Sequence, residues 1–358
     1  MKFNPDIPFT LPVLPPNIDF NNRKFTELLI KARVVLAELK GYSFAMPNPL
    51  LLLSPAILRE SVASSDIENI HTTIIDVLQN QLFPEREQRE NDKEVLRYRD
   101  AILWGFEQLH SLPLSTRVVL GIQKKLIPSS YGKYRSQQNA IIDNATQTRI
   151  YTPPIASEIS RLMSNWENYI NDKNDVVDPL IKSAIAHHQF EAIHPFSDGN
   201  GRTGRILMVL YLVQEEILKW PILYISGYIN DNRGDYYRLL KEVTEEGRWD
   251  DFIVFMLNGF YFQAVETKKT LFDVMNLFET FKKRLKEKHK KIYSADLVEI
   301  LFSFPIITPV KLGNELRIHY TTASRYLSEL AKAGILGENT HGKYHLFINK
   351  ELLAIMEK

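Results

Sequence analysis

The sequence predicts a mainly helical protein that carries one small β-hairpin and ends in a winged helix-turn-helix. Apolar residues recur at helical spacing through most of the first 262 positions. Two β-prone runs flank a turn-rich stretch at about 139–151, which is typical of a hairpin. From about residue 293, three short helical patterns precede a Gly-punctuated pair of strands at 335–348, the order of a winged helix.

The spacing of apolar residues and helix-start signals gives the elements in order. Prolines are frequent in residues 1–22, which predicts an extended arm. We expect helices from Asn22 to about Leu39, from Ser54-Pro55 to about Leu82, over 94–109 and 157–170, from Asp178-Pro179 to about Ile193, and over 204–216. The expected parts are a helical region at 1–110, a core region at 111–262, a connecting helix at 263–292 and the winged helix at 293–358.

Composition excludes several classes of protein. The chain has 358 residues, 44% of them hydrophobic, and a net charge of +1, so bulk charge does not favour a nucleic-acid or membrane partner. It has no cysteine, which excludes disulfides and thiolate catalysis. The longest apolar run, 206–213, is far shorter than the roughly 20 residues that span a bilayer. We therefore expect a cytoplasmic protein with no membrane partner.

The segment 194–205, His-Pro-Phe-Ser-Asp-Gly-Asn-Gly-Arg-Thr-Gly-Arg, is the strongest candidate for a functional site. It joins two predicted helices, and its glycines at 199, 201 and 204 allow tight turns or close approach of a ligand to the backbone. The free N–H groups at the start of the second helix can bind an anion. Arg202 and Arg205 share a face of that helix, and arginine suits forked bonding to phosphate.

The same segment carries polar groups for catalysis and for metal binding. Asp198 offers the hard oxygen that Mg²⁺ uses beside phosphates. His194 can be neutral at pH 7 and can accept a proton from a hydroxyl, and Phe196 is expected to anchor the loop in the core. The ordinary alternative to a functional site is a Gly-rich turn with solvated charges. That alternative is enough to explain Gly199-Asn200-Gly201 when these three residues are considered in isolation. It does not explain the base, metal ligand, anion site and two arginines within twelve residues.

The segment 194–205 resembles the signature of Fic-domain proteins at every defined position, His-Pro-Phe-x-Asp-Gly-Asn-Gly-Arg-x-x-Arg. Further similarity lies at 132–135, 151–154, 221–224 and 235–237. The resemblance implies a Fic-type helical bundle whose hairpin is a flap that aligns a target peptide, by adding a strand. The resemblance also implies transfer of AMP from ATP to a Ser, Thr or Tyr hydroxyl of a protein. The chain itself is one candidate for that protein substrate.

The resemblance also implies a role for each residue of the site. His194 would be the general base, and Asp198 would hold Mg²⁺ on the α- and β-phosphates. The ATP phosphates would further contact the following residues: Gly199, Asn200, Gly201, Arg202 and, toward the γ end, Arg205. Asn230, Asn232 and Tyr236 are weaker candidates for contact with the base and ribose.

A second short motif, Ser64-Ser65-Asp66-Ile67-Glu68-Asn69, resembles the Ser/Thr-x-x-x-Glu-Gly/Asn motif by which many Fic proteins block their own ATP site. Ser64 and Glu68 are four residues apart and so share a helix face. By this resemblance Glu68 would pair with Arg205 within one chain, and Ser64 and Asn69 would belong to the inhibitory site. Without the loop at 194–205, a solvated glutamate on a helix would be the better interpretation.

Other functions remain as alternatives. His187 and His188 with His194 and Asp198 could suggest a metal hydrolase, but His188 continues an apolar helix face and is better explained as a core residue. The module at 293–358 could bind DNA, with Tyr320 at the start of its candidate recognition helix.

Two further alternatives stay within the resemblance. Some Fic relatives transfer another phosphate-containing group and some remove AMP, for which Glu68 could position water. The resemblance also suggests a homodimer, although the mixed surface charge gives no separate signal for one.

Overall fold

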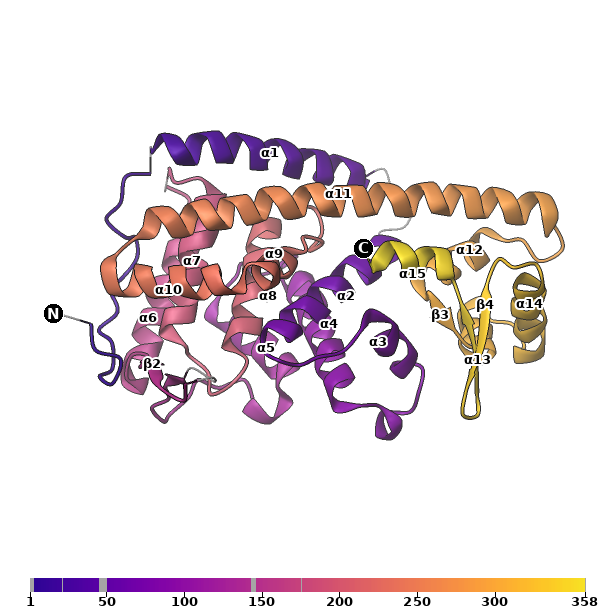
Figure 1. Ribbon diagram of the computed structural model, residues 1–358, viewed down its shortest axis with the longest axis horizontal. Helices are drawn as coiled ribbons and strands as arrows, with labels where there is room; N and C mark the ends of the chain where they lie inside the picture. Colours follow the sequence, from indigo (N-terminus) through magenta and orange to yellow (C-terminus); the bar gives the residue numbers. More distant parts are fainter. Residues whose placement is uncertain (1–2, 21, 45–49, 143–145, 175, 358) are drawn as a thin grey trace.

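The structure is a computed structural model that describes residues 3–20, 22–44, 50–142, 146–174 and 176–357. The catalytic part is a helical bundle (Figure 1). Its helices are α1 (Arg23–Phe44), α2 (Leu50–Ile67), α3 (Ile74–Asn80), α4 (Glu90–Gln108), α5 (Thr116–Leu126), α6 (Ile159–Asn171), α7 (Pro179–Ile193), α8 (Asn200–Gln214), α9 (Ile225–Asp231), α10 (Arg233–Glu246) and α11 (Trp249–Lys288). Single turns of 3₁₀-helix lie at Glu85–Glu87, Pro128–Ser130 and Ala156–Glu158.

Helices α7 and α8 form the centre of the bundle and hold the catalytic loop between them. As predicted, α7 begins after Asp178, whose side chain accepts a hydrogen bond from the backbone N–H of Leu180, with Pro179 in the first turn. Helix α8 is buried on most sides, as its apolar sequence predicts. Because both helices are buried over nearly their whole length, the loop between them has a rigid support.

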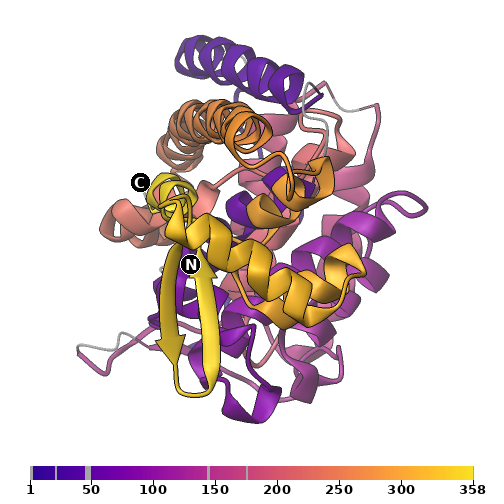
Figure 2. The same cartoon turned by 90° about the vertical axis from the view of Figure 1, so that its right-hand side faces the viewer.

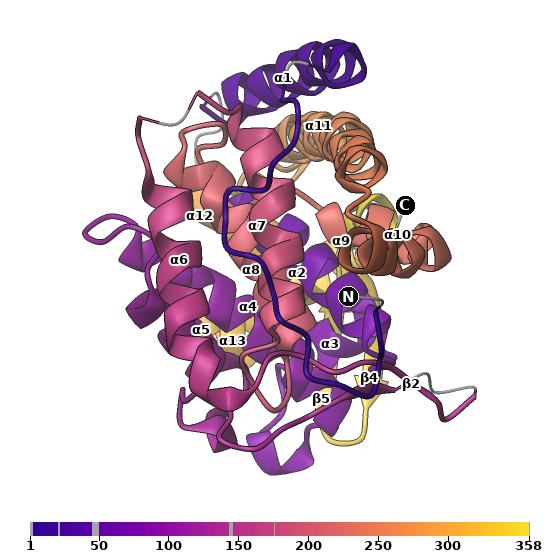
Figure 3. The same ribbon diagram turned by 90° about the vertical axis from the view of Figure 1, so that its left-hand side faces the viewer.

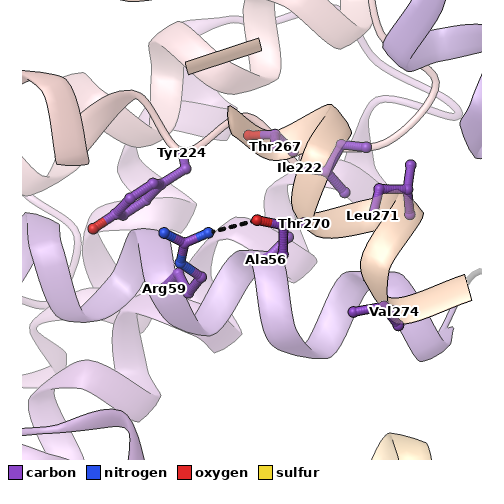
Figure 4. A pocket seen from close by; sticks show the side chains of 8 residues that line it. All are labelled: Ala56, Arg59, Ile222, Tyr224, Thr267, Thr270, Leu271 and Val274. Carbon is purple, nitrogen blue, oxygen red and sulfur yellow. Dashed lines mark hydrogen bonds between the residues drawn. The ribbon is translucent and has the colours of Figure 1, made fainter. Parts of the chain in front are cut away.

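Helix α2, which carries the inhibitory motif, is fixed by buried polar contacts. Arg59 donates to Thr270 Oγ1 at 3.0 Å and lies over the ring of Tyr224, beside a small apolar cavity (Figure 4). Glu60 accepts hydrogen bonds from the backbone N–H of Ser226 at 2.9 Å and from Tyr98 OH at 2.9 Å. Burial raises the pKa of Glu60 to about 7, despite the lowering effect of these hydrogen bonds.

The start of α2 differs from the prediction. The helix begins at Leu50, so Ser54-Pro55 lies inside it rather than at its first position. The leucines at 50–53 are strong helix formers and extend the helix ahead of the proline.

The long helix α11 runs along one side of the molecule, and α1 packs against it (Figure 1). The predicted division between the catalytic core and a connecting helix at 262/263 falls inside this single helix. The reason is that buried positions continue at helical spacing across the division, at Phe260, Ala264, Leu271, Val274 and Phe278. One helix therefore connects the catalytic part to the C-terminal module without a break.

The N-terminal arm and the predicted hairpin lie next to each other. Residues 3–20 contain no helix or strand and cross the face of α6 and α7 (Figure 3). Phe9 N donates to Thr152 O at 2.9 Å, just after the hairpin. The hairpin consists of β1 (Ile141–Ile142) and β2 (Arg149–Tyr151), which pair antiparallel with Ile141 opposite Tyr151. The predicted turn residues at 143–145 lie outside the described residues.

The C-terminal module has the winged-helix order (Figure 2). Its elements are α12 (Ala295–Ser303), β3 (Ile306–Ile307), α13 (Pro309–Leu316), α14 (Tyr320–Lys332), β4 (Gly337–His341), β5 (Tyr344–Ile348) and α15 (Lys350–Met356). The predicted helices and strand pair are confirmed, and β3 and α15 are additional. The three strands form one antiparallel sheet in the order β3-β5-β4. Within the described residues, no helix is both long and apolar enough to cross a membrane.

Candidate active site

The loop between α7 and α8 is held in shape by its own residues. His194 caps α7 in the left-handed conformation, with φ of 50°. The side chain of Asn200 both accepts from Phe196 N and donates to Phe196 O, each at 2.8 Å. Phe196 is fully buried, which confirms the prediction that it anchors the loop. The side chain of Asn200 thus holds the loop in shape. Because it is used in this way, only the backbone of Asn200, at the N-terminus of α8, is available to a ligand.

Arg135 is a second support that the sequence did not reveal. It lies before the hairpin, is 5% exposed, and donates from Nε to His194 O at 2.9 Å. Its Nη2 donates to Pro154 O at 2.6 Å, and its backbone N–H donates to Pro195 O at 2.9 Å. Arg135 therefore joins the catalytic loop to both ends of the flap. Nothing in the spacing of a single arginine could have indicated this.

The imidazole of His194 is arranged as a base. Its Nδ1 lies 3.3 Å from the carbonyl oxygen of Glu191, so we assign the proton to Nδ1 and leave Nε2 free to accept another. Burial lowers the pKa of His194 to about 4, although the hydrogen bond to Glu191 O and the carboxylates of Glu68 and Asp198 oppose the shift. A histidine with this pKa is neutral at pH 7.

The low pKa of His194 predicts the acid limb of the pH profile. In the free enzyme, kcat/KM for AMP transfer should stay level down to about pH 5 and fall as His194 is protonated near pH 4. An unperturbed histidine, with a pKa of about 6.5, would already be almost wholly protonated at pH 5. The profile should be measured by incorporation of labelled AMP, with Glu68→Gly as the active background. A midpoint near pH 6.5 would contradict the assignment.

Arg205 bonds to the predicted inhibitory motif through two of its guanidinium nitrogens, Nε and Nη2. It is 1% exposed, and its Nε donates to Ser64 Oγ at 2.8 Å. Its Nη2 donates to Ser64 O at 2.9 Å and to Glu68 Oε1 at 2.8 Å. The structure therefore brings Ser64, Glu68 and Arg205 together as the sequence predicted.

Glu68 lies at the N-terminus of α8, where an anion would bind. A Cβ atom added at Gly201 would collide with Glu68 Oε1, so only glycine lets the carboxylate approach the helix this closely. Burial would raise the pKa of Glu68, but the Arg205 guanidinium outweighs it and holds the pKa below its usual value. Glu68 is thus a carboxylate at neutral pH and stands where phosphate oxygens would lie.

Gly204 has a comparable steric role. A Cβ atom there would collide with Glu191 Oε1. Burial raises the pKa of Glu191 to about 8, against the lowering effect of Arg205. Glu191 is therefore mostly neutral at pH 7. Glu68, and not Glu191, is the carboxylate that forms an ion pair with Arg205.

The end of the inhibitory helix explains the last residue of its motif. Asn69 has φ of 62°, and the bonds from Ile70 N to Ser65 O (3.0 Å) and from Asn69 N to Asp66 O (2.9 Å) form a Schellman motif. Asparagine and glycine tolerate this left-handed conformation best, so Asn69 is the residue that ends the helix and turns the chain just after Glu68.

Substitution of Asn69 should therefore affect inhibition through the backbone. Asn69→Gly should inhibit as well as the wild type. Asn69→Val should raise AMP transfer by up to about tenfold, because a β-branched residue in this conformation costs roughly 1–2 kcal/mol. Transfer and thermal unfolding of the two variants should be compared. Equal transfer by both would show that the turn does not hold Glu68.

Arg202 and Asp198 form the open side of the site. Arg202 Nη1 lies 2.6 Å from Glu94 Oε2, and Nη2 lies 3.6 Å from Asp198 Oδ1. The side chain of Asp198 is 72% exposed, and its Oδ1 accepts from Gly199 N at 2.6 Å. An exposed carboxylate beside the anion site of α8 fits a Mg²⁺ ion that is shared with phosphates. Glu94 was missed because a single acidic residue on a distant helix carries no motif.

The three weaker candidates for contact with the nucleotide each have a hydrogen-bond partner within the protein. Asn230 Nδ2 donates to Asp66 Oδ2 at 2.9 Å and so supports the inhibitory helix. Asn232 Nδ2 donates to Tyr228 O at 2.9 Å within its own turn. Tyr236 is buried in the core, with its hydroxyl 2.7 Å from His187 Nε2. Of the three, Tyr236 lies near the catalytic loop, since the charges of Glu191 and Arg205 act on its hydroxyl. Asn230 and Asn232 bond to Asp66 and Tyr228 and not to the loop.

The arrangement does not support a metal hydrolase. His187 and His188 are buried, and His188 Nε2 lies 3.2 Å from Leu240 O, which confirms the core interpretation of His188. Within the described parts of the chain, no three His, Asp or Glu side chains are placed to hold a metal ion together.

Three family models match the chain. The Fic/DOC family model matches residues 113–212, the Fic/DOC family N-terminal model matches 26–107, and the C-terminal domain model of SoFic-like protein adenylyltransferases matches 277–352. The two Fic/DOC models together match just over half of the chain. The chain therefore belongs to the Fic/DOC family.

Curated relatives are similar to part of the chain. A protein adenylyltransferase Fic of Culex quinquefasciatus is 35% identical over 115 residues, which are 31% of this chain and 22% of that protein. One of Aedes aegypti is 36% identical over 107 residues, which are 30% of this chain and 20% of that protein. The chain thus spans about a fifth of the length of these relatives.

Solved structures agree in fold. A Fic family protein from Desulfovibrio desulfuricans aligns with a TM-score of 0.61 over 94% of this chain and 98% of that one, at 20% identity. A Fic-domain signalling protein from Bacteroides thetaiotaomicron aligns with a TM-score of 0.52 over 70% of this chain and 96% of that one, at 17% identity. At these identities the likeness concerns the fold alone.

Proposed function

We propose that the protein is an adenylyltransferase that moves AMP from Mg-ATP to a Ser, Thr or Tyr hydroxyl of a protein. The observation that carries this proposal is the group at the N-terminus of α8. A neutral His194, an exposed Asp198 and two buried arginines converge there, and the Glu68 carboxylate stands at the anion site. The names of the curated relatives support the same reaction.

The chemistry follows from the placement of these groups. The target hydroxyl oxygen attacks the α-phosphorus of ATP, the bond from that phosphorus to the bridging oxygen breaks, and pyrophosphate leaves. The hydroxyl proton passes to His194 Nε2, which the bond of Nδ1 to Glu191 O leaves free. Asp198 would hold Mg²⁺, which offsets charge on the phosphates. Arg202 and the N–H groups of α8 would bind phosphate oxygens.

The flap would hold the target next to His194. Strands β1 and β2 present exposed Ile142 and Ile150, and Arg135 ties this region to the carbonyl oxygen of His194. A target segment that adds to the hairpin as a further strand would place its hydroxyl beside the loop.

Mass spectrometry tests the reaction directly. The Glu68→Gly protein should be incubated with Mg-ATP, alone and with a cell extract. The expected product is a protein, or this chain itself, whose mass has increased by AMP less water. ATP hydrolysis with no adduct on any protein would contradict transfer, and an adduct of another phosphate-containing group would reassign the donor.

A further inference from the structure

Arg202 is a buried cation with one carboxylate partner on another helix. Its side chain is 3% exposed, and Nη1 lies 2.6 Å from Glu94 Oε2. Glu94 lies in the second turn of α4, and its side chain is 28% exposed. A buried guanidinium without a counter-charge is costly, so Glu94 stabilises Arg202 in this position.

The other edge of the same guanidinium, formed by Nε and Nη2, does not contact Glu94 through a hydrogen bond. Arg202 Nε is buried and has no hydrogen-bond partner among the residues that the structure describes. Nη2 lies 3.6 Å from Asp198 Oδ1, on the exposed side of the loop. In arginine, Nε–H and one Nη2–H point the same way and form a fork that fits two phosphate oxygens. Glu94 takes the remaining nitrogen, and within the described residues the fork keeps only the 3.6 Å ion pair of Nη2 with Asp198.

Arg205 shows the opposite arrangement. Its Nε and Nη2 fork is filled by Ser64 and Glu68. The two arginines of the loop therefore differ. The fork of Arg205 is filled by short hydrogen bonds, whereas the fork of Arg202 has only the longer contact of Nη2 with Asp198.

We propose that Glu94 is a positioning residue for the nucleotide: it holds Arg202 by Nη1 so that the Nε–Nη2 fork faces the phosphates. This inference rests on the proposed function, because it takes ATP as the ligand. Glu94 itself touches no substrate atom. Its carboxylate acts through Arg202, and its loss should affect phosphate binding but not adenosine binding.

The test compares Glu68→Gly with Glu68→Gly/Glu94→Gln. We expect Glu94→Gln to weaken ATP binding about tenfold, within the range of a charge-assisted hydrogen bond, and to leave adenosine affinity unchanged. In transfer assays KM for ATP should rise with kcat nearly constant. The control is Glu90→Gln, one turn earlier on α4, where the side chain is 60% exposed and pairs with Arg97 at 2.9 Å.

Each outcome separates the inference from the proposed function. Failure of Glu68→Gly itself to bind ATP would contradict the proposed function. ATP binding that is unchanged by Glu94→Gln would overturn the role of Glu94. Tighter binding would also overturn it, since Glu94 would then compete with phosphate for Arg202.

The wing of the C-terminal module carries a second, independent inference. Phe83, which is 7% exposed, stacks against His341 and Tyr344 with ring centroids 5.1 and 4.6 Å away. Glu87 accepts from Tyr344 OH at 3.0 Å and lies 3.2 Å from Lys343 Nζ. The tip of the β4–β5 hairpin is therefore docked on residues 83–87 of the same chain.

The docked segment is connected to the exit from the inhibitory helix. Asn91 Nδ2 donates to His71 O at 3.0 Å, and Asp92 accepts from Thr72 Oγ1. Asp92 is fully buried, so these bonds fix residues 71 and 72 firmly to the start of α4. We infer that docking of the wing stabilises the position of Glu68 beside Arg205.

Hydrogen exchange of the full-length chain tests this coupling without any assay of transfer. Tyr344→Ala and Lys343→Glu should each speed exchange of amides in 70–92 and strengthen ATP binding, by about twofold to tenfold for the small energies of exposed pairs and ring contacts. The swap Glu87→Lys/Lys343→Glu should restore both. Lys311→Glu is the matched control, because Lys311 pairs with Glu315 inside the module at 2.7 Å.

Faster exchange that is confined to the wing, with 70–92 protected as in the wild type, would overturn the coupling. So would unchanged ATP binding in a variant whose segment 70–92 has loosened.

Discussion

Replacing Glu68 by glycine is expected to raise AMP transfer about tenfold to a hundredfold over the wild-type chain, the range of a coupling of roughly 1–3 kcal/mol. The substitution removes the charged partner of Arg205 Nη2, leaving only Ser64 O, and clears the space beside Gly201. Both changes favour productive phosphate binding at the N-terminus of α8. Incorporation of labelled AMP at saturating Mg-ATP measures the effect.

Two further variants show which property of Glu68 matters. Glu68→Gln keeps the size of the side chain but not its charge, and should give an intermediate rate. Glu90→Gly removes an exposed carboxylate of α4 and should leave the rate unchanged. Equal incorporation by wild type and Glu68→Gly would exclude Glu68 as a restraint.

Replacing His194 by alanine in the Glu68→Gly background is expected to lower transfer by about 10²–10⁴-fold, the usual loss when a general base is removed. ATP binding should persist, because the arginines and the N-terminus of α8 remain. Binding is measured by calorimetry and transfer by labelled AMP. The control is His110→Ala, an exposed histidine at the end of α4. Full activity in Glu68→Gly/His194→Ala would remove His194 from the mechanism.

The parts that the sequence predicted are those where the signal is local. His194, Asp198, Arg202 and Arg205 lie within twelve consecutive residues, and two helix ends fix their geometry. The cap at Asp178 and the buried Phe196 also follow from neighbouring residues. The pair of Glu68 with Arg205 spans 137 residues and was predictable only from the family resemblance of both motifs.

The features that could not be predicted from the sequence depend on partners far away in the chain, or on a helix that continues across an expected boundary. Arg135 meets His194 O across 59 residues, and Glu94 meets Arg202 across 108. A single charged residue has many possible partners, so neither contact could be read from a pattern. The division at 262/263 falls inside α11, because buried positions continue at helical spacing across it.

The contact between Glu68 and Arg205 forms within a single chain and so does not depend on the protein concentration. Both residues belong to one chain, and α2 is tied to α9 and α11 by Glu60 and Arg59. The carboxylate therefore meets the guanidinium at an effective concentration set by the fold and not by the amount of protein. A block by this contact would be first-order: diluting the protein would not relieve it, and a nucleotide would compete with an anion that is tethered in the same chain.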